Sequence, residues 1–251
     1  MLKFITEKKV KVRTVYDVLN EISPFELQEE WDNSGLLVGE WDSDVKKIYL
    51  TLDIDQSVLE RVEENSLIIA HHPVIFRGIK NIVPVDFSRK FAYELIRKNI
   101  SYIAMHTNFD KTHLNEYFAK KVLGLEGTSE DFIFYSDVFM DFEELVNLVK
   151  EKMGLETLRV VKSKDFVKKV AVTTGAGMSL LPFVKADCFL TGDIKYHEAM
   201  DAKARGVSLI DIGHYESEKY FVDVLYEAIY GEIGLDIEIL KINSQNPFKF
   251  L

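Results

Sequence analysis

Most histidines of this sequence come directly, or one short turn, after segments that are predicted to be strands. The chain contains six histidines, and five have this placement: His71 and His72 after residues 67–70, His106 after 100–105, His197 after 189–191, and His214 after 207–212. In parallel sheets, ligands bind at the edge where the carboxyl ends of the strands meet. A single histidine is more often a structural residue of the core. Five with the same placement predict a shared binding site.

The consecutive pair His71-His72, followed by Pro73, predicts two metal ions. Neighbouring side chains on a regular strand point to opposite faces, so two adjacent imidazoles serve one ion poorly. Pro73 disfavours the α-helical region for His72, which lets the two side chains diverge toward two nearby points as the strand ends. The alternative is that the pair is only the polar end of a strand.

Carboxylates at suitable positions complete the candidate ligands. His214 and Glu218 are four residues apart at the start of a predicted helix, so they share one face and can approach the same ion. Asp110 follows His106 by four residues, and Asp193 comes soon after another predicted strand. The alternatives are structural. Glu218 suits the first turn of a helix, and Asp110 or Asp193 suits a helix N-cap.

These side chains favour hydrolysis with divalent metal ions. Nitrogen and oxygen ligands without a thiolate suit zinc, iron, manganese or nickel equally. Two ions per chain, about 3.5 to 4 Å apart, would generate a hydroxide nucleophile at neutral pH. We expect His106 or His197 to move protons, because imidazole titrates near neutral pH. The segment with Gly175 and Gly177 links a strand to a helix, where backbone N–H groups can bind a phosphate; a tight turn is the alternative.

The remainder of the chain alternates strand-like and helix-like runs, which predicts an α/β fold with mainly parallel sheets. The predicted strands are residues 36–38, 47–52, 67–70, 100–105, 158–161, 169–173, 189–191, 207–212 and 237–242. The predicted helices are residues 15–22, 56–64, 87–98, 114–123, 142–153, 180–185, 197–205 and 217–230. Gly124, Gly127, Thr128 and Ser129 form the clearest break, so we expect a domain boundary near there.

Composition excludes several classes of protein. A hydrophobic content of 47% over 251 residues is that of a globular protein. The net charge of −10 argues against general nucleic-acid binding through a basic surface. We expect a cytoplasmic protein without a membrane span, because the sequence lacks a long apolar run and its start lacks the features of a signal peptide. Cys188 is alone and lies in an apolar run, which predicts a buried thiol.

In their order along the chain, five motifs resemble those of the Nif-three-like proteins, a family often named type 2 GTP cyclohydrolase I. The motifs are Trp31-Asp32-Asn33-Ser34-Gly35-Leu36, Ala70-His71-His72-Pro73 with Ile75-Phe76, His106-Thr107-Asn108-Phe109-Asp110, Thr191-Gly192-Asp193-Ile194-Lys195-Tyr196-His197, and Gly213-His214 with Glu218. Together they extend over most of the chain and are specific in combination.

The resemblance implies a dinuclear metal site and a fold. His71, Asp110 and Glu218 match the ligands of one ion, and His72, His214 and the bridging Glu218 match those of the other. The implied fold has two similar three-layer α/β domains with mainly parallel or mixed sheets and the metals in the cleft between them. The first domain would contain residues 1–126 and 219–251, and the second residues 127–218. Family members commonly form a hexameric ring, so a homo-oligomer is expected.

The resemblance also implies a reaction on a small-molecule nucleotide. Water would attack C8 of the guanine in GTP, the ring would open, formate would leave, and recyclisation would give dihydroneopterin triphosphate. Lys195 and residues 175–179 are candidates for binding the triphosphate. Two alternatives remain: phosphoester hydrolysis at the same metal pair, and a protein without catalytic activity that carries metal or binds partners, because the fold does not decide function.

One segment departs from the family pattern. Residues 111–115, Lys-Thr-His-Leu-Asn, are shorter than the usual Gly-Gly-x-Asn stretch after the Asp110 motif and lack both glycines. This departure leaves the ligand residues in place. Without the two glycines the segment is expected to be stiffer, and His113 is expected to be a surface or substrate-facing residue. The departure therefore puts the substrate preference in question.

Overall fold

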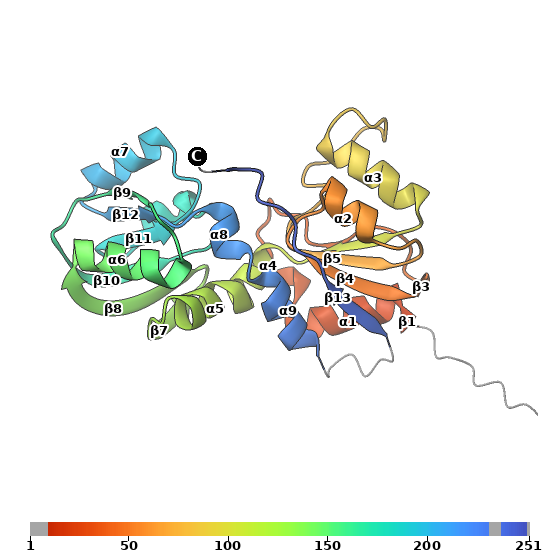
Figure 1. Ribbon diagram of the computed structural model, residues 1–251, viewed down its shortest axis with the longest axis horizontal. Helices are drawn as coiled ribbons and strands as arrows, with labels where there is room; N and C mark the ends of the chain where they lie inside the picture. Colours follow the sequence, from red (N-terminus) through yellow and green to blue (C-terminus); the bar gives the residue numbers. More distant parts are fainter. Residues whose placement is uncertain (1–9, 231–236, 250–251) are drawn as a thin grey trace, which may run out of the picture. The chain divides into compact units, whose positions relative to one another are not determined.

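The computed structural model describes residues 10–230 and 237–249, which form two compact α/β units (Figure 1). Of the described residues, the first unit contains 10–109, 221–230 and 237–249, and the second contains 110–220. The sequence predicts the first boundary near residue 126, whereas the units divide after Phe109. The expectation that the chain start carries no signal peptide concerns residues 1–9, which lie outside the described residues.

The first unit is built on a five-stranded sheet in the order β13-β4-β5-β6-β2. The first four of these strands are parallel, and β2 is antiparallel to β6 at one edge. The strands are β2 (Gly35–Val38), β4 (Lys47–Thr51), β5 (Leu67–Ala70), β6 (Ser101–Ala104) and β13 (Glu238–Lys241), with a separate antiparallel pair of β1 (Val10–Lys11) and β3 (Asp44–Val45). The parallel order places the ends of β4, β5 and β6 at one edge.

Helices cover both faces of this sheet. In Figure 1, α2 and α3 lie over one face, and α1 and α9 lie over the other. Ile68 of β5 packs with Val58 of α2 and Leu95 of α3 in one apolar cluster, so the central strand is buried as the predicted apolar run requires. The helices are α1 (Val12–Ile22), the 3₁₀ helix η1 (Phe25–Leu27), α2 (Gln56–Arg61), α3 (Phe87–Arg97), α4 (Thr107–Phe109) and α9 (Phe221–Ile229).

The second unit is built on a six-stranded mixed sheet in the order β7-β8-β10-β11-β12-β9. β10, β11 and β12 are parallel, and the outer strands are antiparallel to their neighbours. The strands are β7 (Gly127–Glu130), β8 (Ile133–Asp141), β9 (Arg159–Val161), β10 (Phe166–Val172), β11 (Cys188–Thr191) and β12 (Ser208–Asp211). The expectation of a break at residues 124–129 misses β7 and β8. Strand β7 has the polar sequence Gly-Thr-Ser-Glu and lies at the edge of the sheet. Its antiparallel pairing with β8 stabilises it as a strand.

Two apolar layers hold this second sheet. Phe118, Leu145 and Cys188 belong to the layer on one face, and Leu181 and Phe189 to the layer on the other. The predicted burial of Cys188 is confirmed, and burial raises the pKa of its thiol. The helical elements are η2 (Asp110–Leu114), α5 (Asn115–Tyr117), η3 (Phe118–Val122), α6 (Phe142–Met153), η4 (Met178–Phe183), α7 (Tyr196–Ala204) and α8 (His214–Glu218).

Three predicted helices differ from the observed elements. Helical structure begins at Thr107 instead of residue 114, and η2 and η3 are π-helical. The helix predicted at 180–185 is the 3₁₀ helix η4, which contains Pro182. The helix predicted at 217–230 is divided into α8 and α9 where the chain passes from the second unit to the first.

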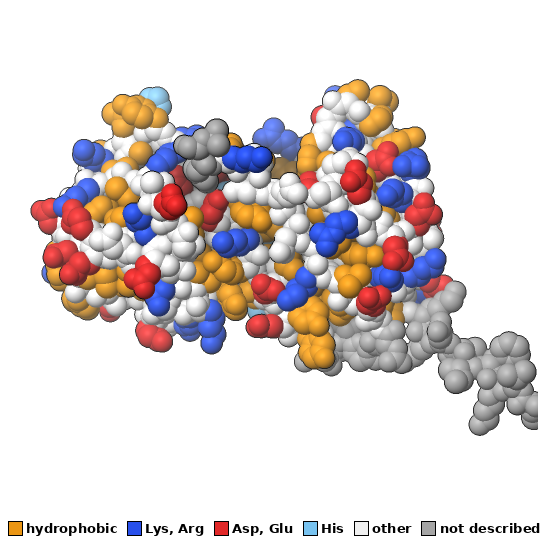
Figure 2. Space-filling model, viewed as in Figure 1, with side chains coloured by type: hydrophobic (Ala, Val, Ile, Leu, Met, Phe, Trp, Pro, Cys, Tyr) orange, Lys and Arg blue, Asp and Glu red, His pale blue; other side chains and the backbone are white. Residues whose placement is uncertain are grey.

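The surface carries both signs of charge. Lysine and arginine side chains are interspersed with acidic ones over the face drawn in Figure 2. Within residues 10–230 and 237–249, every helix is too short or too polar to cross a bilayer.

Candidate functional site

Three histidines gather at the carboxyl edge of the first sheet. His71 and His72 follow β5, and His106 follows the neighbouring parallel strand β6. One ring nitrogen of each histidine lies within 4.8 Å of one ring nitrogen of the other two. The ring centroid of His71 is 4.9 Å from that of His72 and 5.1 Å from that of His106. The fold of the first unit therefore brings these three residues together, and we call them the histidine cluster.

Hydrogen bonds at Nδ1 fix the rings of His71 and His72. His71 Nδ1 donates to the backbone carbonyl of Met105 at 2.9 Å, and His72 Nδ1 donates to Asp53 Oδ1 at 2.7 Å. Asp53 follows β4, the strand beside β5, so its carboxylate reaches His72 from the same edge. Since a carbonyl and a carboxylate accept hydrogen bonds, the proton of each ring is on Nδ1 and the lone pair is on Nε2. This is the arrangement found in histidines that bind metals.

Asp32 orients His106 from a fully buried position. Its Oδ1 accepts from His106 Nδ1 at 2.7 Å, and its Oδ2 accepts from the backbone N–H and the hydroxyl of Thr107 at 3.1 and 2.6 Å. The Ser34 hydroxyl donates to Oδ2 at 3.0 Å. Burial by itself would raise the pKa of Asp32. The hydrogen bond and charge of His106, with the donors of Thr107 and Asn33, hold that pKa well below its ordinary value of 3.8. Asp32 is therefore an ionised anchor for the imidazole.

In the second unit, a histidine and a glutamate lie one helical turn apart on α8. His214 Nε2 is 3.0 Å from Glu218 Oε2, as the predicted i, i+4 spacing requires. Glu218 is almost completely buried. Helix α8 follows β12, so this pair is positioned by the end of a parallel strand, as the histidine cluster is in the first unit.

Asp110 belongs to the same edge of the second unit. Its Oδ1 is 3.5 Å from the hydroxyl of Thr174, which follows β10. Asp110 lies inside the helical run that begins at Thr107, so it does not take the alternative role of an N-cap. It opens the π-helical segment η2, and such segments are frequent at functional sites.

Asp193 supports His214 in the way that Asp53 supports His72. His214 Nδ1 donates to Asp193 Oδ2 at 2.7 Å, which directs the Nε2 edge of the ring toward Glu218. Asp193 follows β11 and has a positive φ of 56°. The N-cap of α7 is Lys195, so Asp193 does not take that role, and its carboxylate instead orients the ring of His214.

The two predicted substrate-binding glycines are required for close packing. Gly175 has φ +61°, and a Cβ at this position would lie 1.9 Å from Glu218 Oε1. A Cβ at Gly177 would lie 2.7 Å from the Thr191 hydroxyl oxygen. The N–H of Gly175 donates to Ser217 Oγ, and that of Gly177 donates to Thr191 Oγ1. Because protein atoms accept from both N–H groups, this geometry supports a role in seating Glu218 more than a role in phosphate binding.

The other predicted site residues are more exposed. Lys195 is 82% exposed and lies 3.9 Å from Glu198, and His197 is exposed at the first turn of α7 beside Tyr196. His113 is partly buried on η2, where burial lowers its pKa, and its Nδ1 is 2.8 Å from the Thr112 hydroxyl. The structure therefore holds His106 by a buried carboxylate, whereas His197 is a surface residue.

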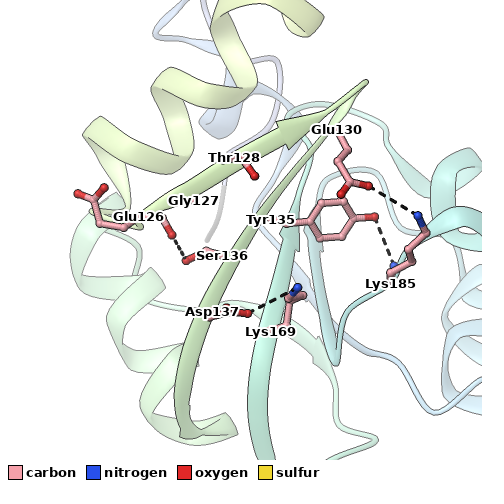
Figure 3. A pocket seen from close by; sticks show the side chains of 9 residues that line it. All are labelled: Glu126, Gly127, Thr128, Glu130, Tyr135, Ser136, Asp137, Lys169 and Lys185. Carbon is pink, nitrogen blue, oxygen red and sulfur yellow. Dashed lines mark hydrogen bonds and ion pairs between the residues drawn. The ribbon is translucent and has the colours of Figure 1, made fainter.

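A separate hollow of about 260 Å³ lies at the outer edge of the second sheet (Figure 3). Both lysines of the hollow are paired with acidic residues: Lys185 is 3.7 Å from Glu130, and Lys169 is 3.6 Å from Asp137. Such exposed pairs leave little net charge to attract a ligand. The histidines and carboxylates at the strand ends are therefore the better candidate for the functional site.

The donor set at the strand ends fits divalent metal ions. It consists of imidazole nitrogens whose Nδ1–H groups are bound elsewhere, and of carboxylates that are partly or almost fully buried. Zinc, iron, manganese and nickel accept such ligands. In the first unit His71, His72 and His106 could hold an ion. In the second unit the corresponding donors are Asp110, His214 and Glu218.

Asp32 and Asp53 were not predicted as residues of the site. Asp53 comes two residues after a strand that the sequence predicts correctly, so the rule that selected the histidines would also have selected it. Asp32 lies in a turn before β2, far from His106 in sequence, and only the motif around it marked it.

Comparison with known proteins gives consistent matches over nearly the whole chain. The profile of the family described as Duf34/NIF3 (NGG1p interacting factor 3) matches residues 10–247. The sequence is 44% identical to the GTP cyclohydrolase 1 type 2 homolog of Campylobacter jejuni, over 96% of this chain and 100% of that protein. It is 42% identical to the GTP cyclohydrolase 1 type 2 of Helicobacter pylori, over 96% and 99%. The crystal structure of the Staphylococcus aureus hypothetical protein SA1388 superimposes with a TM-score of 0.83 and 25% identity, over 97% and 100%.

Proposed function

The chain belongs to the Duf34/NIF3 family, and from this membership and the chemistry of the strand ends we propose that it is a metal-dependent hydrolase of GTP. The proposed products are formate and dihydroneopterin triphosphate. A related protein is named GTP cyclohydrolase 1 type 2, which supports this reaction. The observation that carries the proposal is that three of the candidate histidines donate Nδ1–H to a carbonyl or carboxylate, as metal-binding histidines do.

We propose that donors from both units hold one pair of metal ions. His71, Asp110 and Glu218 would hold one ion, and His72, His214 and Glu218 the other. When bound, such a pair supplies Lewis acidity and lowers the pKa of coordinated water. Glu218 would be shared by the two ions, and its nearly complete burial and the missing Cβ of Gly175 suit a carboxylate held in one position.

His106 is the proposed proton shuttle. Its ring is fixed through Nδ1 by the ionised carboxylate of Asp32, so Nε2 is the atom that exchanges protons. Opening of the guanine imidazole requires a proton to be delivered to a ring nitrogen as the bond to C8 breaks. An imidazole that a buried carboxylate holds in one tautomer suits this task. The exposed His197 has a less constrained environment.

Release of formate from GTP by the metal-loaded protein tests this proposal. We expect the His72→Ala variant to lose activity, and the His106→Ala variant to lose about 100-fold or more, the usual contribution of an acid–base residue. His197→Ala is the matched control and should keep most of the activity. Equal rates for the wild type and His72→Ala would remove the proposal, and release of inorganic phosphate without formate would replace it with phosphoester hydrolysis.

A further inference from the structure

Two aromatic side chains lie exposed beside the histidine cluster. Trp31 is 58% exposed and Phe76 is 39% exposed, although both residues are large and apolar. Their ring centroids are 5.8 Å apart, and each is 6.2 Å from the ring centroid of His106. All of these residues belong to the first unit, so their arrangement is a property of that unit alone.

We propose that Trp31 and Phe76 form the seat for the planar base of the substrate, a purine. This inference rests on the proposed function, because it assigns the base-binding part of the same site. Stacking of a base on an aromatic side chain is favourable for any base and uses the exposed face of the ring. The 6.2 Å separation from His106 would place a stacked base next to the proposed proton shuttle.

The geometry of the two rings indicates how a base would bind. Their planes are inclined by 56°, so they form two sides of a corner and not a parallel sandwich. A purine would stack on one ring and meet the other by its edge, which are the two preferred contacts between aromatic groups. His106 is nearly perpendicular to both rings, at 77° to Trp31 and 79° to Phe76. Its imidazole plane is therefore parallel to neither aromatic ring.

Hydrogen bonds of the surrounding backbone hold this corner open. Asn33 Nδ2 donates to the carbonyl of Ile75, which joins the turn that carries Trp31 to the loop that carries Phe76. The neighbouring Ser34 N–H donates to Gln28 Oε1 at 2.8 Å. These bonds fix the backbone on both sides of the aromatic pair, so the two side chains stay at the surface without packing into the core. A preformed seat costs less ordering on binding than a flexible one.

Tryptophan fluorescence tests the seat independently of turnover. The chain has two tryptophans, and the other, Trp41, packs in the first unit against Tyr16 at 4.9 Å and Arg13 at 5.0 Å. In Trp41→Phe, where Trp31 is the reporter, we expect guanosine and GTP to quench the fluorescence and tripolyphosphate, which has no base, to leave it unchanged. In the matched control Trp31→Phe, where Trp41 is the reporter, we expect no quenching. Quenching of Trp41 alone, or of neither tryptophan, would overturn the inference.

Steady-state kinetics give a second and separate result. Trp31→Leu keeps an apolar side chain but removes the aromatic face, so we expect the KM for GTP to rise about 5- to 100-fold with a smaller change in kcat. Trp31→Phe should restore most of the loss, because a phenyl ring also stacks. An unchanged KM in Trp31→Leu, with normal release of formate, would overturn the seat and leave the proposed reaction standing.

Two other outcomes separate the two proposals. Quenching of Trp31 by guanosine without any release of formate would support the seat and refute the proposed reaction. If Trp31→Leu instead weakens self-association of the chain and purines leave the fluorescence unchanged, the aromatic pair is a contact between copies and the seat is refuted.

Discussion

Gly175 offers a sharp test of how the proposed metal ligand Glu218 is held. An alanine at this position would bring its Cβ to 1.9 Å from Glu218 Oε1, where a distance below 3.0 Å is essentially never seen. The carboxylate must therefore retreat by about 1.1 Å to reach 3.0 Å. Distances between metals and their ligands tolerate about 0.2 Å. We predict that Gly175→Ala binds metal about 10- to 100-fold more weakly than the wild type. A loss of this size is typical even when only a residue that hydrogen-bonds to a metal ligand is removed.

Gly154→Ala is the matched control, because it isolates the backbone strain. Gly154 has φ +66°, close to the +61° of Gly175, and a Cβ at Gly154 would meet no atom within 4 Å. A residue with a Cβ in this left-handed region costs about 1–2 kcal/mol. Both variants should therefore lose about the same free energy of unfolding from strain, and any larger loss in Gly175→Ala reports the clash with Glu218.

The assay has two parts. Metal per chain is measured by elemental analysis after dialysis against a competing chelator, and the free energy of unfolding is measured with the metal removed. We expect Gly154→Ala to keep the wild-type metal content and Gly175→Ala to lose most of it. If Gly175→Ala binds metal as tightly as Gly154→Ala, Glu218 is not a ligand whose position matters, and the assignment fails.

Two further predictions concern the aspartates that orient histidines. Asp193→Asn should weaken metal binding about 10- to 100-fold, because a neutral amide is a weaker acceptor for His214 Nδ1–H than a carboxylate and can also present its NH2 group. Asp201→Asn on the exposed side of α7 should leave metal binding unchanged; equal metal affinities of the two variants in competition with a chelator would contradict this. The pKa of Asp32 is held well below 3.8 in the folded protein, so its contribution to stability is complete above that value and is lost as the pH falls through the folded-state pKa. In acid denaturation without metal, Asp32→Asn should be less stable at neutral pH and should lose stability less steeply below pH 3.8 than the wild type; parallel curves would contradict this.

The strands that position the site could be predicted because their sequences are apolar on both faces. Residues 67–70 and 189–191 are buried strands in the structure as predicted. Strands β7 and β8 were missed, since the glycine and hydroxyl residues at 127–129 have the composition of a break. β7 is held by its ladder with β8, a long-range interaction that a local pattern does not record. The sequence predicts a domain boundary near residue 126, whereas the two compact units divide after Phe109.

The histidines of the site were predictable from their positions, but their partners were only partly so. His71, His72 and His106 follow strands whose parallel order brings their ends together, so spacing alone led to the cluster. Asp32 acts on His106 from a turn 74 residues away in sequence. Whether Asp110 and Asp193 are helix N-caps could be judged only from the path of the backbone. Asp110 lies within a helical run that begins at Thr107, and Asp193 has a positive φ.

Counting metal ions per chain tests the central claim most directly. We expect about two ions in the wild type after loading, about one in His72→Ala of the first unit, which removes a ligand of one ion only, and less than one in Glu218→Ala of the second, which removes the ligand shared by both. A wild type that takes up no metal, or a Glu218→Ala variant that still holds two ions, would contradict the claim.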